Sequence, residues 1–244
     1  MKISYKHLVR CIEEKPSIEE ISDKLFQLGH EHEITDGVFD LEITPNRGDC
    51  LSLNGILREL NIFFKLINNN NIYTGDIQKF DLDFVNYSKK FCSNISFLKI
   101  EIKNNVQKYN NQLKYYFEDL DIPKNNFFTD VSNYVMYETG QPTHCYDSRK
   151  INGKISLVEI ENEINFETLL NKKITLKDKN HLFLMNDIPI NLAGIMGAKN
   201  TACSPETSSI LLECAHFLPE KIMGQSLKYG INSDAAHKFE RGVD

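Results

Sequence analysis

The chain has 244 residues, 41% of them hydrophobic and 25% charged, which is the composition of a soluble globular protein with one large domain or two ordinary ones. Its net charge of −6 argues against wholesale electrostatic binding of nucleic acid, and no apolar run reaches the roughly 18 residues of a membrane helix. Six scattered cysteines without a C-x-x-C pair favour neither a disulfide framework nor a zinc site, and the N-terminus lacks the apolar core of a signal peptide. We therefore expect a cytoplasmic protein that binds no metal and no membrane.

The first 72 residues predict a small helical domain. Ser17 and Glu20 have the spacing of a capping box, and Gly29 suits the C-terminus of the helix that follows. The asparagine-rich residues 68–75 mark the predicted domain boundary. The expected elements are a short strand or a helix start at 2–10, a helix from Ser17 to Gly29, a half-buried strand at 38–43 and an amphipathic helix at 53–64.

Residues 84–244 predict a second domain in which strands and helices are mixed. Asp130 is expected to cap the helix that follows it, and Pro219 fits the first turn of a later helix. The predicted fold class is α+β, with a small N-terminal helical domain followed by a mixed sheet with flanking helices. The expected strands lie at 98–102, 154–160, 181–185, 189–195 and 208–214, and the expected helices lie at 111–120, after Asp130, at 219–229 and from Ser233.

Three polar residues can meet around the end of the helix that follows Asp130. Ser132 and Asn133 lie on this helix, which Gly140 is suited to end, and His144 follows the turn. All three side chains can face one cleft, although a lone histidine is more often structural than catalytic. The neighbouring Cys145 does not form a dyad with His144, because adjacent residues of an extended chain point to opposite sides.

Two later segments leave a structural and a functional interpretation open. The apolar segment 193–197 contains two glycines and fits either a buried strand that enters a turn or a backbone that approaches a ligand closely. Glu213 interrupts an apolar strand, and an unpaired buried charge is costly. It is therefore expected to face water from an edge strand, to pair with a residue such as Arg241, or to serve a functional site.

At these residues the chain resembles the β subunit of bacterial phenylalanine–tRNA ligases. Five segments occur in the same order across nearly the whole chain, which is far more specific than any one of them alone. They are Asp40 to Ser52 (DLEITPNRGDCLS), Asn133 to Met136 (NYVM), Gly140 to His144 (GQPTH), Leu192 to Gly197 (LAGIMG) and Phe239 to Asp244 (FERGVD).

This resemblance implies a domain arrangement and a set of site residues. Residues 1–72 would be the N-terminal helical domain, and 84–244 the editing domain, which hydrolyses tyrosine wrongly attached to phenylalanine tRNA. Ser132, Asn133 and His144 match polar residues of the editing pocket, and Glu213 matches the acid that recognises the tyrosine hydroxyl. The remaining matches are Gly194 and Met196 at the wall against the aromatic ring, Ser233 and Ala235 at the far wall, and Lys2 as a basic residue near the pocket.

The residue types fit this chemistry. A pocket that hydrogen-bonds a substrate hydroxyl can discriminate by about 10⁴–10⁵, whereas a pocket that must reject an added hydroxyl achieves only about 10². Ester hydrolysis needs a positioned water and polar groups near the carbonyl, which Ser132, Asn133 and His144 can supply. The resemblance also implies phenylalanine tRNA and a ligase α subunit as partners, in a heterotetramer. ATP and magnesium would bind outside this chain, which needs no cofactor of its own.

The chain departs from the family pattern at several places. Asp40 follows Gly29 by only eleven positions, so the oligonucleotide-binding barrel that usually lies between these segments is absent. Glu159 stands where arginine is common, and Thr143 and Cys145 replace the usual apolar residue and alanine beside His144. The alternative to an editing hydrolase is a tRNA-binding or structural module with a decayed pocket, and a free-standing editing protein is a third interpretation. We expect a fragment, since the family's later domains would follow Asp244.

Overall fold

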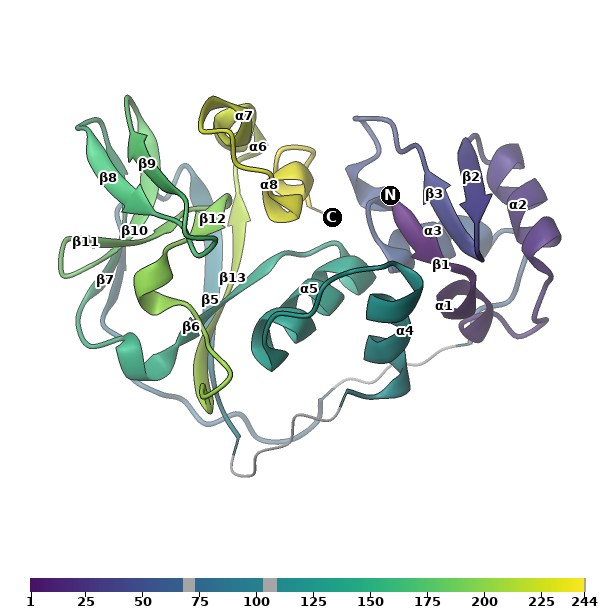
Figure 1. Ribbon diagram of the computed structural model, residues 1–244, viewed down its shortest axis with the longest axis horizontal. Coiled ribbons are helices and arrows are strands. Elements are labelled where there is room, and N and C mark those ends of the chain that lie inside the picture. The colour runs from purple at the N-terminus through teal and green to yellow at the C-terminus, as the bar shows by residue number, and fades with distance from the viewer. Residues whose placement is uncertain (68–72, 103–108, 244) are drawn as a thin grey trace.

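The N-terminal segment forms a three-stranded sheet with three helices beside it (Figure 1). The computed structural model describes residues 1–67, 73–102 and 109–243, so part of the predicted boundary at 68–75 lies outside the described residues. Both alternatives for residues 2–10 occur, because a strand is followed at once by a helix. The elements are β1 (Lys2–Ser4), α1 (Tyr5–Arg10), α2 (Ile18–Gln27), β2 (His32–Thr35), β3 (Val38–Leu41) and α3 (Leu53–Leu60), and the sheet order is β1-β3-β2.

Local signals place the helix ends in this segment. The predicted capping box of α2 is confirmed: the Glu20 backbone N–H donates to Ser17 Oγ over 3.2 Å, and the Ser17 N–H donates to Glu20 Oε2 over 2.7 Å. Gly29 follows α2 with a φ of +85°, a conformation that glycine adopts without strain. The second predicted helix, α3, begins directly after its N-cap Ser52 and ends at Leu60, which is earlier than expected.

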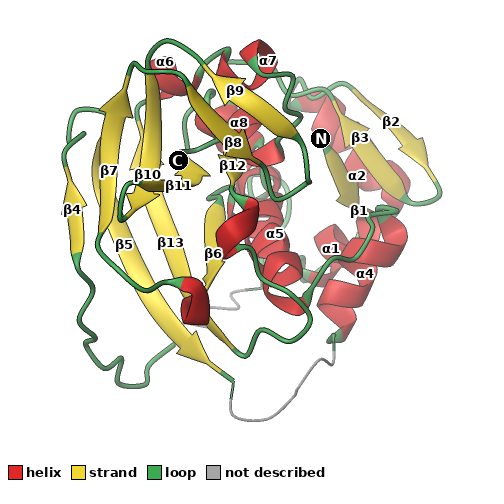
Figure 2. Cartoon of the chain, turned by 60° about the vertical axis from the view of Figure 1, so that its left-hand side comes forward, coloured by secondary structure: helices red, strands yellow, loops and turns green. Residues whose placement is uncertain are grey.

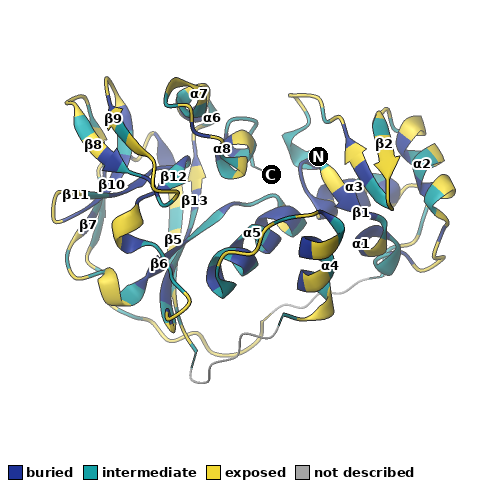
Figure 3. Ribbon diagram, in the orientation of Figure 1, coloured by how far each residue is buried: buried dark blue, intermediate teal, exposed yellow. Residues whose placement is uncertain are grey.

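The hydrophobic core of the N-terminal segment extends across the predicted boundary. Helices α4 (Asn111–Asp119) and α5 (Phe127–Thr139) supply Tyr116, Phe117 and Tyr137 to the same buried cluster as Ile3, Leu25 and Ile56. Polar contacts join the same parts, since Ser4 Oγ donates to Asp119 over 2.7 Å. Figure 3 shows the buried faces of α4 and α5 turned toward each other and toward α1. Both helices therefore pack on the N-terminal segment, and α5 also packs on the strand β6 (Thr143–Asp147) of the sheets beyond it.

Two sheets form the other half of the molecule (Figure 2). The five-stranded sheet has the order β12-β11-β10-β7-β4, and a three-stranded sheet has the order β5-β13-β6, with a separate hairpin of β8 and β9. This confirms the predicted α+β class with a mixed sheet, since β4 pairs with β7 in parallel. The strands are β4 (Phe84–Asn86), β5 (Cys92–Glu101), β6 (Thr143–Asp147), β7 (Ile155–Ile160), β8 (Ile164–Glu167), β9 (Lys173–Leu176), β10 (Asn180–Met185), β11 (Ile188–Leu192), β12 (Met196–Gly197) and β13 (Ser209–Phe217).

Helix α5 carries the predicted polar pair, but its start differs from the prediction. The N-cap is Asn126, whose side chain accepts a hydrogen bond from the Thr129 N–H, so the expected cap at Asp130 is wrong. Asp130 is instead buried within the helix, where it accepts hydrogen bonds from Tyr109 Oη over 2.6 Å and from the Asn125 N–H over 2.9 Å. The end of the helix is as predicted, because Gly140 adopts a φ of +85°.

The predicted helix at 219–229 is wrong as a single element. It consists of two short helices, α6 (Pro219–Ile222) and α7 (Gln225–Lys228), separated by Gly224 with a φ of +76°. The last helix, α8 (Asp234–Phe239), begins as predicted after Ser233, whose Oγ accepts from the Ala236 N–H. In the described part of the chain, none of the helices has the length and apolar character needed to span a bilayer.

Candidate functional site

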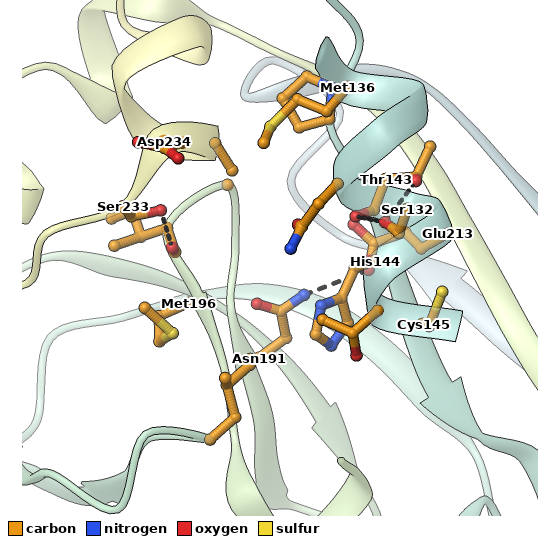
Figure 4. A pocket seen from close by; sticks show the side chains of 18 of the residues that line it. Ser132, Met136, Thr143, His144, Cys145, Asn191, Met196, Glu213, Ser233 and Asp234 are labelled. Atoms are coloured by element: carbon orange, nitrogen blue, oxygen red, sulfur yellow. Dashed lines mark hydrogen bonds between the residues drawn. The ribbon is translucent and has the colours of Figure 1, made fainter. Parts of the chain in front are cut away.

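A pocket of about 470 Å³ lies between α5, the strands β6, β11 and β13, and the start of α8 (Figure 4). It brings together eight of the nine residues that the sequence singled out. These are Ser132, Asn133, His144, Gly194, Met196, Glu213, Ser233 and Ala235.

Strand register explains why His144 and Glu213 are neighbours. Strand β13 is central in its sheet, with β5 on one side and β6 on the other, and Glu213 lies directly opposite His144 of β6. Opposed residues of an antiparallel pair share a face with Cβ atoms roughly 5 Å apart. Cys145 points the other way, as predicted, and its thiol contacts the Phe128 carbonyl. The two residues that the sequence set 69 positions apart thus meet on one wall of the pocket.

Glu213 is a buried carboxyl group without a cationic partner among the described residues. Only 4% of the residue is exposed, and its Oε2 accepts hydrogen bonds from Tyr146 Oη over 2.5 Å and from Asn191 Nδ2 over 3.3 Å. Burial raises the pKa of Glu213 to about 7, while these two hydrogen bonds act to lower it. The predicted alternative of an exposed edge strand is wrong, because Glu213 is buried on the central strand β13. The predicted pairing with Arg241 is also wrong, because Arg241 contacts His237 and Glu240 instead.

His144 has one side in the pocket and one nitrogen fully enclosed. Its Nε2 is buried without a hydrogen-bond partner, and burial lowers the pKa of the imidazole to about 4, so the ring is neutral near pH 7. Gly197 lies against the ring: a Cβ atom there would be only 2.2 Å from His144 Cε1. Position 197 therefore needs glycine to leave room for the imidazole.

Ser132 is held by the strand that carries His144. Its hydroxyl donates to the Thr143 carbonyl over 2.8 Å and forms a second hydrogen bond of 2.8 Å with Thr143 Oγ1. Asn133, the next residue of α5, also lines the pocket and is half-buried. The family departure at Thr143 thus adds a contact between α5 and β6.

The opposite wall is built by the loop after β11 and by the start of α8. Gly194 has a φ of +73°, and a Cβ atom there would be 2.6 Å from Ile222 Cδ1, so this backbone packs tightly against α6. Ser233 Oγ donates to the Ile195 carbonyl over 2.7 Å, which ties α8 to this loop. In Figure 4, Ser233 and Met196 lie across the pocket from His144 and Ser132.

Lys2 does not reach the pocket. It is exposed on β1, opposite Asp40 of β3, and is not among the lining residues. The basic side chain closest in sequence to the far wall, Lys238, is also engaged elsewhere, since its ammonium group donates to the Leu51 carbonyl. The expected contribution of Lys2 to the pocket is therefore not supported.

One group of possible metal ligands occurs in the described part of the chain, away from the pocket. One ligand atom each of His30, Cys50 and Glu59 lies within 4.8 Å of the others. The guanidinium of Arg47 already occupies this position, at 2.8 Å from Cys50 Sγ and 3.0 Å from Glu59 Oε1. Burial also raises the pKa of the Cys50 thiol to about 12, which opposes the thiolate that a metal requires. These residues are better described as an ion-pair cluster.

Sequence reasoning missed two residues of the site. Tyr146 follows His144 by two positions and so shares its face of β6, a signal that the alternation of a strand could have given. Asn191 comes from β11, whose pairing with β12 brings it to the same wall as Gly197 of the predicted glycine-bearing segment. Only the arrangement of the two sheets places these residues beside Glu213 and His144.

Comparisons with known proteins give the relatives of this chain. A family described as "B3/4 domain" matches residues 92–244, which is more than half of the chain. The phenylalanine–tRNA ligase beta subunit of Francisella tularensis is 34% identical over 249 residues, covering 96% of this chain and 31% of the relative. That of Dechloromonas aromatica is 34% identical over 222 residues, covering 87% of this chain and 27% of the relative.

The chain thus spans about a third or less of these relatives. A solved N-terminal fragment of the phenylalanyl-tRNA synthetase beta subunit from Pyrococcus horikoshii covers 99% of this chain and 73% of its own, with a TM-score of 0.47 and 15% identity. The chain belongs to the B3/4 domain family and is a relative of phenylalanine–tRNA ligase beta subunits over nearly its whole length.

Proposed function

We propose that this chain hydrolyses tyrosine wrongly esterified to phenylalanine tRNA, as the editing part of a phenylalanine–tRNA ligase β subunit. The observation that carries the proposal is the buried carboxyl group of Glu213, which lines a pocket of about 470 Å³ next to His144. A buried acceptor binds a ligand with a hydroxyl group more tightly, because this group forms a hydrogen bond with it. A ligand without the hydroxyl group leaves the acceptor unpaired. Tyrosine and phenylalanine differ by this hydroxyl alone.

The polar side chains suit hydrolysis by a positioned water. Ser132 Oγ is hydrogen-bonded to Thr143 and not to a base, which argues against a serine nucleophile. A pKa of about 4 makes His144 a weak base near neutral pH, so we assign it to orienting water or the ester by hydrogen bonding. Asn133 and Ser132 would complete the polar side of the pocket, while Gly194, Met196, Ser233 and Ala235 would enclose the aromatic ring.

The partners follow from the names of the relatives. We propose phenylalanine tRNA and a ligase α subunit as the partners, with amino-acid activation, ATP and magnesium at sites outside this chain. The alternative function is a tRNA-binding or structural module without hydrolysis, which the missing barrel segment between Gly29 and Asp40 favours. An open pocket that contains both Glu213 and His144 favours editing over decay.

Hydrolysis of charged tRNA tests the proposal. Purified protein is incubated with phenylalanine tRNA carrying tyrosine or phenylalanine, and release of the amino acid is followed. We expect the wild type to clear the tyrosyl ester and to spare the phenylalanyl ester, and His144→Ala to slow tyrosyl hydrolysis strongly. His216→Ala is the matched control, because it removes an exposed histidine of β13. Binding of the tRNA without any hydrolysis would instead establish the alternative.

A further inference from the structure

Three buried side chains from three strands form a closed triangle beneath the pocket. Tyr146 of β6 donates its hydroxyl to Glu213 Oε2 over 2.5 Å, and Asn191 of β11 donates from Nδ2 to the same oxygen over 3.3 Å and to Tyr146 Oη over 2.9 Å. The three residues are 1%, 4% and 4% exposed. Because β11 belongs to the other sheet, the triangle joins the two sheets at the acid of the pocket.

The triangle uses one oxygen of Glu213 and leaves the other. Both internal donors reach Oε2, and among the described residues no other group donates to this carboxyl. A carboxylate can accept on both of its oxygens. Since Glu213 lines the pocket, Oε1 is the acceptor that remains for a ligand.

Apart from the carboxyl of Asp234, which lines the same pocket, the titratable groups described around Glu213 are neutral near pH 7. His144 on β6 has a pKa lowered by burial, and the thiols of Cys92 on β5 and Cys145 on β6 have pKa values raised to about 12 by burial. Cys214, the next residue of β13, also has a raised pKa. Because no cation in the described part of the chain contacts Glu213, the hydroxyl of Tyr146 and the amide of Asn191 are the groups that favour its ionised form.

We propose that Tyr146 and Asn191 are positioning residues for tyrosine recognition: they fix Glu213 through Oε2 and favour its ionised form, whose Oε1 takes the hydroxyl of the substrate ring. This inference rests on the proposed editing function and adds to it the origin of its specificity. A protonated Glu213 would carry a donor as well and would no longer demand a hydroxyl group from the ligand. Glu213 would then bind two phenols at once, one from the protein and one from the substrate.

The variants Tyr146→Phe and Asn191→Ala test the positioning role, with Tyr229→Phe as the matched control. Tyr229→Phe also removes a hydroxyl group that forms hydrogen bonds, in this case to Lys177 and Asn180, but Tyr229 does not line the pocket. Two quantities are measured from pH 5 to 9. One is the protonation of Glu213, from the carboxyl ¹³C NMR signal of glutamate-labelled protein with Glu213→Gln for assignment, and the other is the ratio of tyrosyl to phenylalanyl ester hydrolysis.

Loss of a hydrogen bond to the carboxylate should raise the pKa of Glu213, so Tyr146→Phe should move both midpoints upward by about one pH unit. Asn191→Ala should move them in the same direction by less, because its bond is longer, and Tyr229→Phe should not move them. Unchanged midpoints, or a selectivity loss that is equal at every pH, would overturn the proposal. The NMR midpoint needs no hydrolysis: if the wild type fails to distinguish the esters, the proposed function fails, while the titration still decides whether Tyr146 and Asn191 control Glu213.

Discussion

Two acidic centres in the described part of the chain, the half-buried Asp49 and the buried Glu213, are built in opposite ways. In the N-terminal segment, Asp49 meets the Arg47 guanidinium at 3.0 Å, and this ion pair lowers the pKa of the Asp49 carboxyl to about 2. In the pocket, Glu213 meets only neutral donors, and burial raises its pKa to about 7. The carboxylate of Asp49 is neutralised by a cation and contributes to the stability of the fold. The carboxyl group of Glu213 is bound only by neutral donors and can still accept a further hydrogen bond. Under the proposed function, Asp49 is a structural acid and Glu213 is a binding one.

Closing the space around His144 should have the largest effect on the pocket side of this comparison. A Cβ atom at position 197 would overlap the His144 ring, so Gly197→Ala must shift the imidazole. A misplacement of about 1 Å can cost roughly 10²-fold in rate, and we expect at least that loss of tyrosyl hydrolysis. Gly153→Ala is the control, because its new methyl group meets only the end of the Asn186 side chain. Equal activity of Gly197→Ala and wild type would exclude a need for the present position of His144.

The second largest effect is expected in the pH dependence of stability, in which Glu213 and Asp49 should differ. The folded pKa of Glu213, about 7, lies above its ordinary value of 4.5, so between these values the folded state binds more protons than the unfolded state. The contribution of Glu213 to stability is therefore complete below pH 4.5 and is lost as the pH rises through 7. Relative to Glu213→Gln, the wild type should lose about 2–3 kcal/mol of unfolding free energy between pH 5 and 8.

Urea unfolding of both proteins at several pH values measures this difference. Comparison with the variant is needed because His144 acts in the opposite direction: its folded pKa of about 4 lies below 6.5, so its burial costs stability as the pH falls from 6.5 toward 4. A difference between wild type and Glu213→Gln that does not change with pH would mean that Glu213 has an ordinary pKa.

Removing the cation of the structural centre should lower stability without affecting specificity. Arg47→Met leaves Asp49 and Glu59 without the guanidinium that contacts both. Because these side chains are partly exposed, we expect a loss of only about 1–2 kcal/mol in unfolding free energy. The ratio of tyrosyl to phenylalanyl hydrolysis should stay as in the wild type at a temperature where the variant is folded. A changed ratio in folded Arg47→Met would show that the two centres are coupled.

The smallest effect is expected at Thr143. Thr143→Val removes the hydroxyl that is hydrogen-bonded to Ser132 but keeps the backbone carbonyl that Ser132 also contacts. The loss of one such hydrogen bond is worth about 1 kcal/mol in unfolding free energy, with a rate change of a few-fold. Thermal unfolding and tyrosyl hydrolysis measure the two effects. A complete loss of hydrolysis would assign Thr143 a direct role in the reaction.

The sequence predicted well those features that depend on neighbouring residues. The capping box at Ser17, the helix end at Gly140 and the start of α8 at Ser233 are decided within a few positions of the chain. Where two local signals compete, prediction failed: Asn126 caps α5 ahead of Asp130, and Gly224 interrupts the helix that Pro219 begins. Short strands such as β8 and β9 have too few residues to show a clear alternation.

The candidate site was predicted in its members but not in its contacts. The family resemblance selected Ser132, Asn133, His144 and Glu213, which all line one pocket. The partners of Glu213 depend on the register of β6 against β13 and on the second sheet, which no local pattern specifies. No local pattern specifies the position of Lys2 either, which lies on β1 and is not part of the pocket lining.

The proposed selection of the tyrosyl ester by Glu213 can be tested in one experiment. Hydrolysis of tyrosine- and phenylalanine-charged phenylalanine tRNA is measured for wild type, Glu213→Ala and Glu167→Ala, which removes a half-buried β8 carboxylate paired with Lys199 outside the pocket lining. We expect wild type and Glu167→Ala to hydrolyse the tyrosyl ester preferentially. Glu213→Ala should lose roughly 10- to 100-fold of that preference, the contribution of a hydrogen bond to a charged group. An unchanged preference in Glu213→Ala would show that Glu213 does not select the tyrosyl ester.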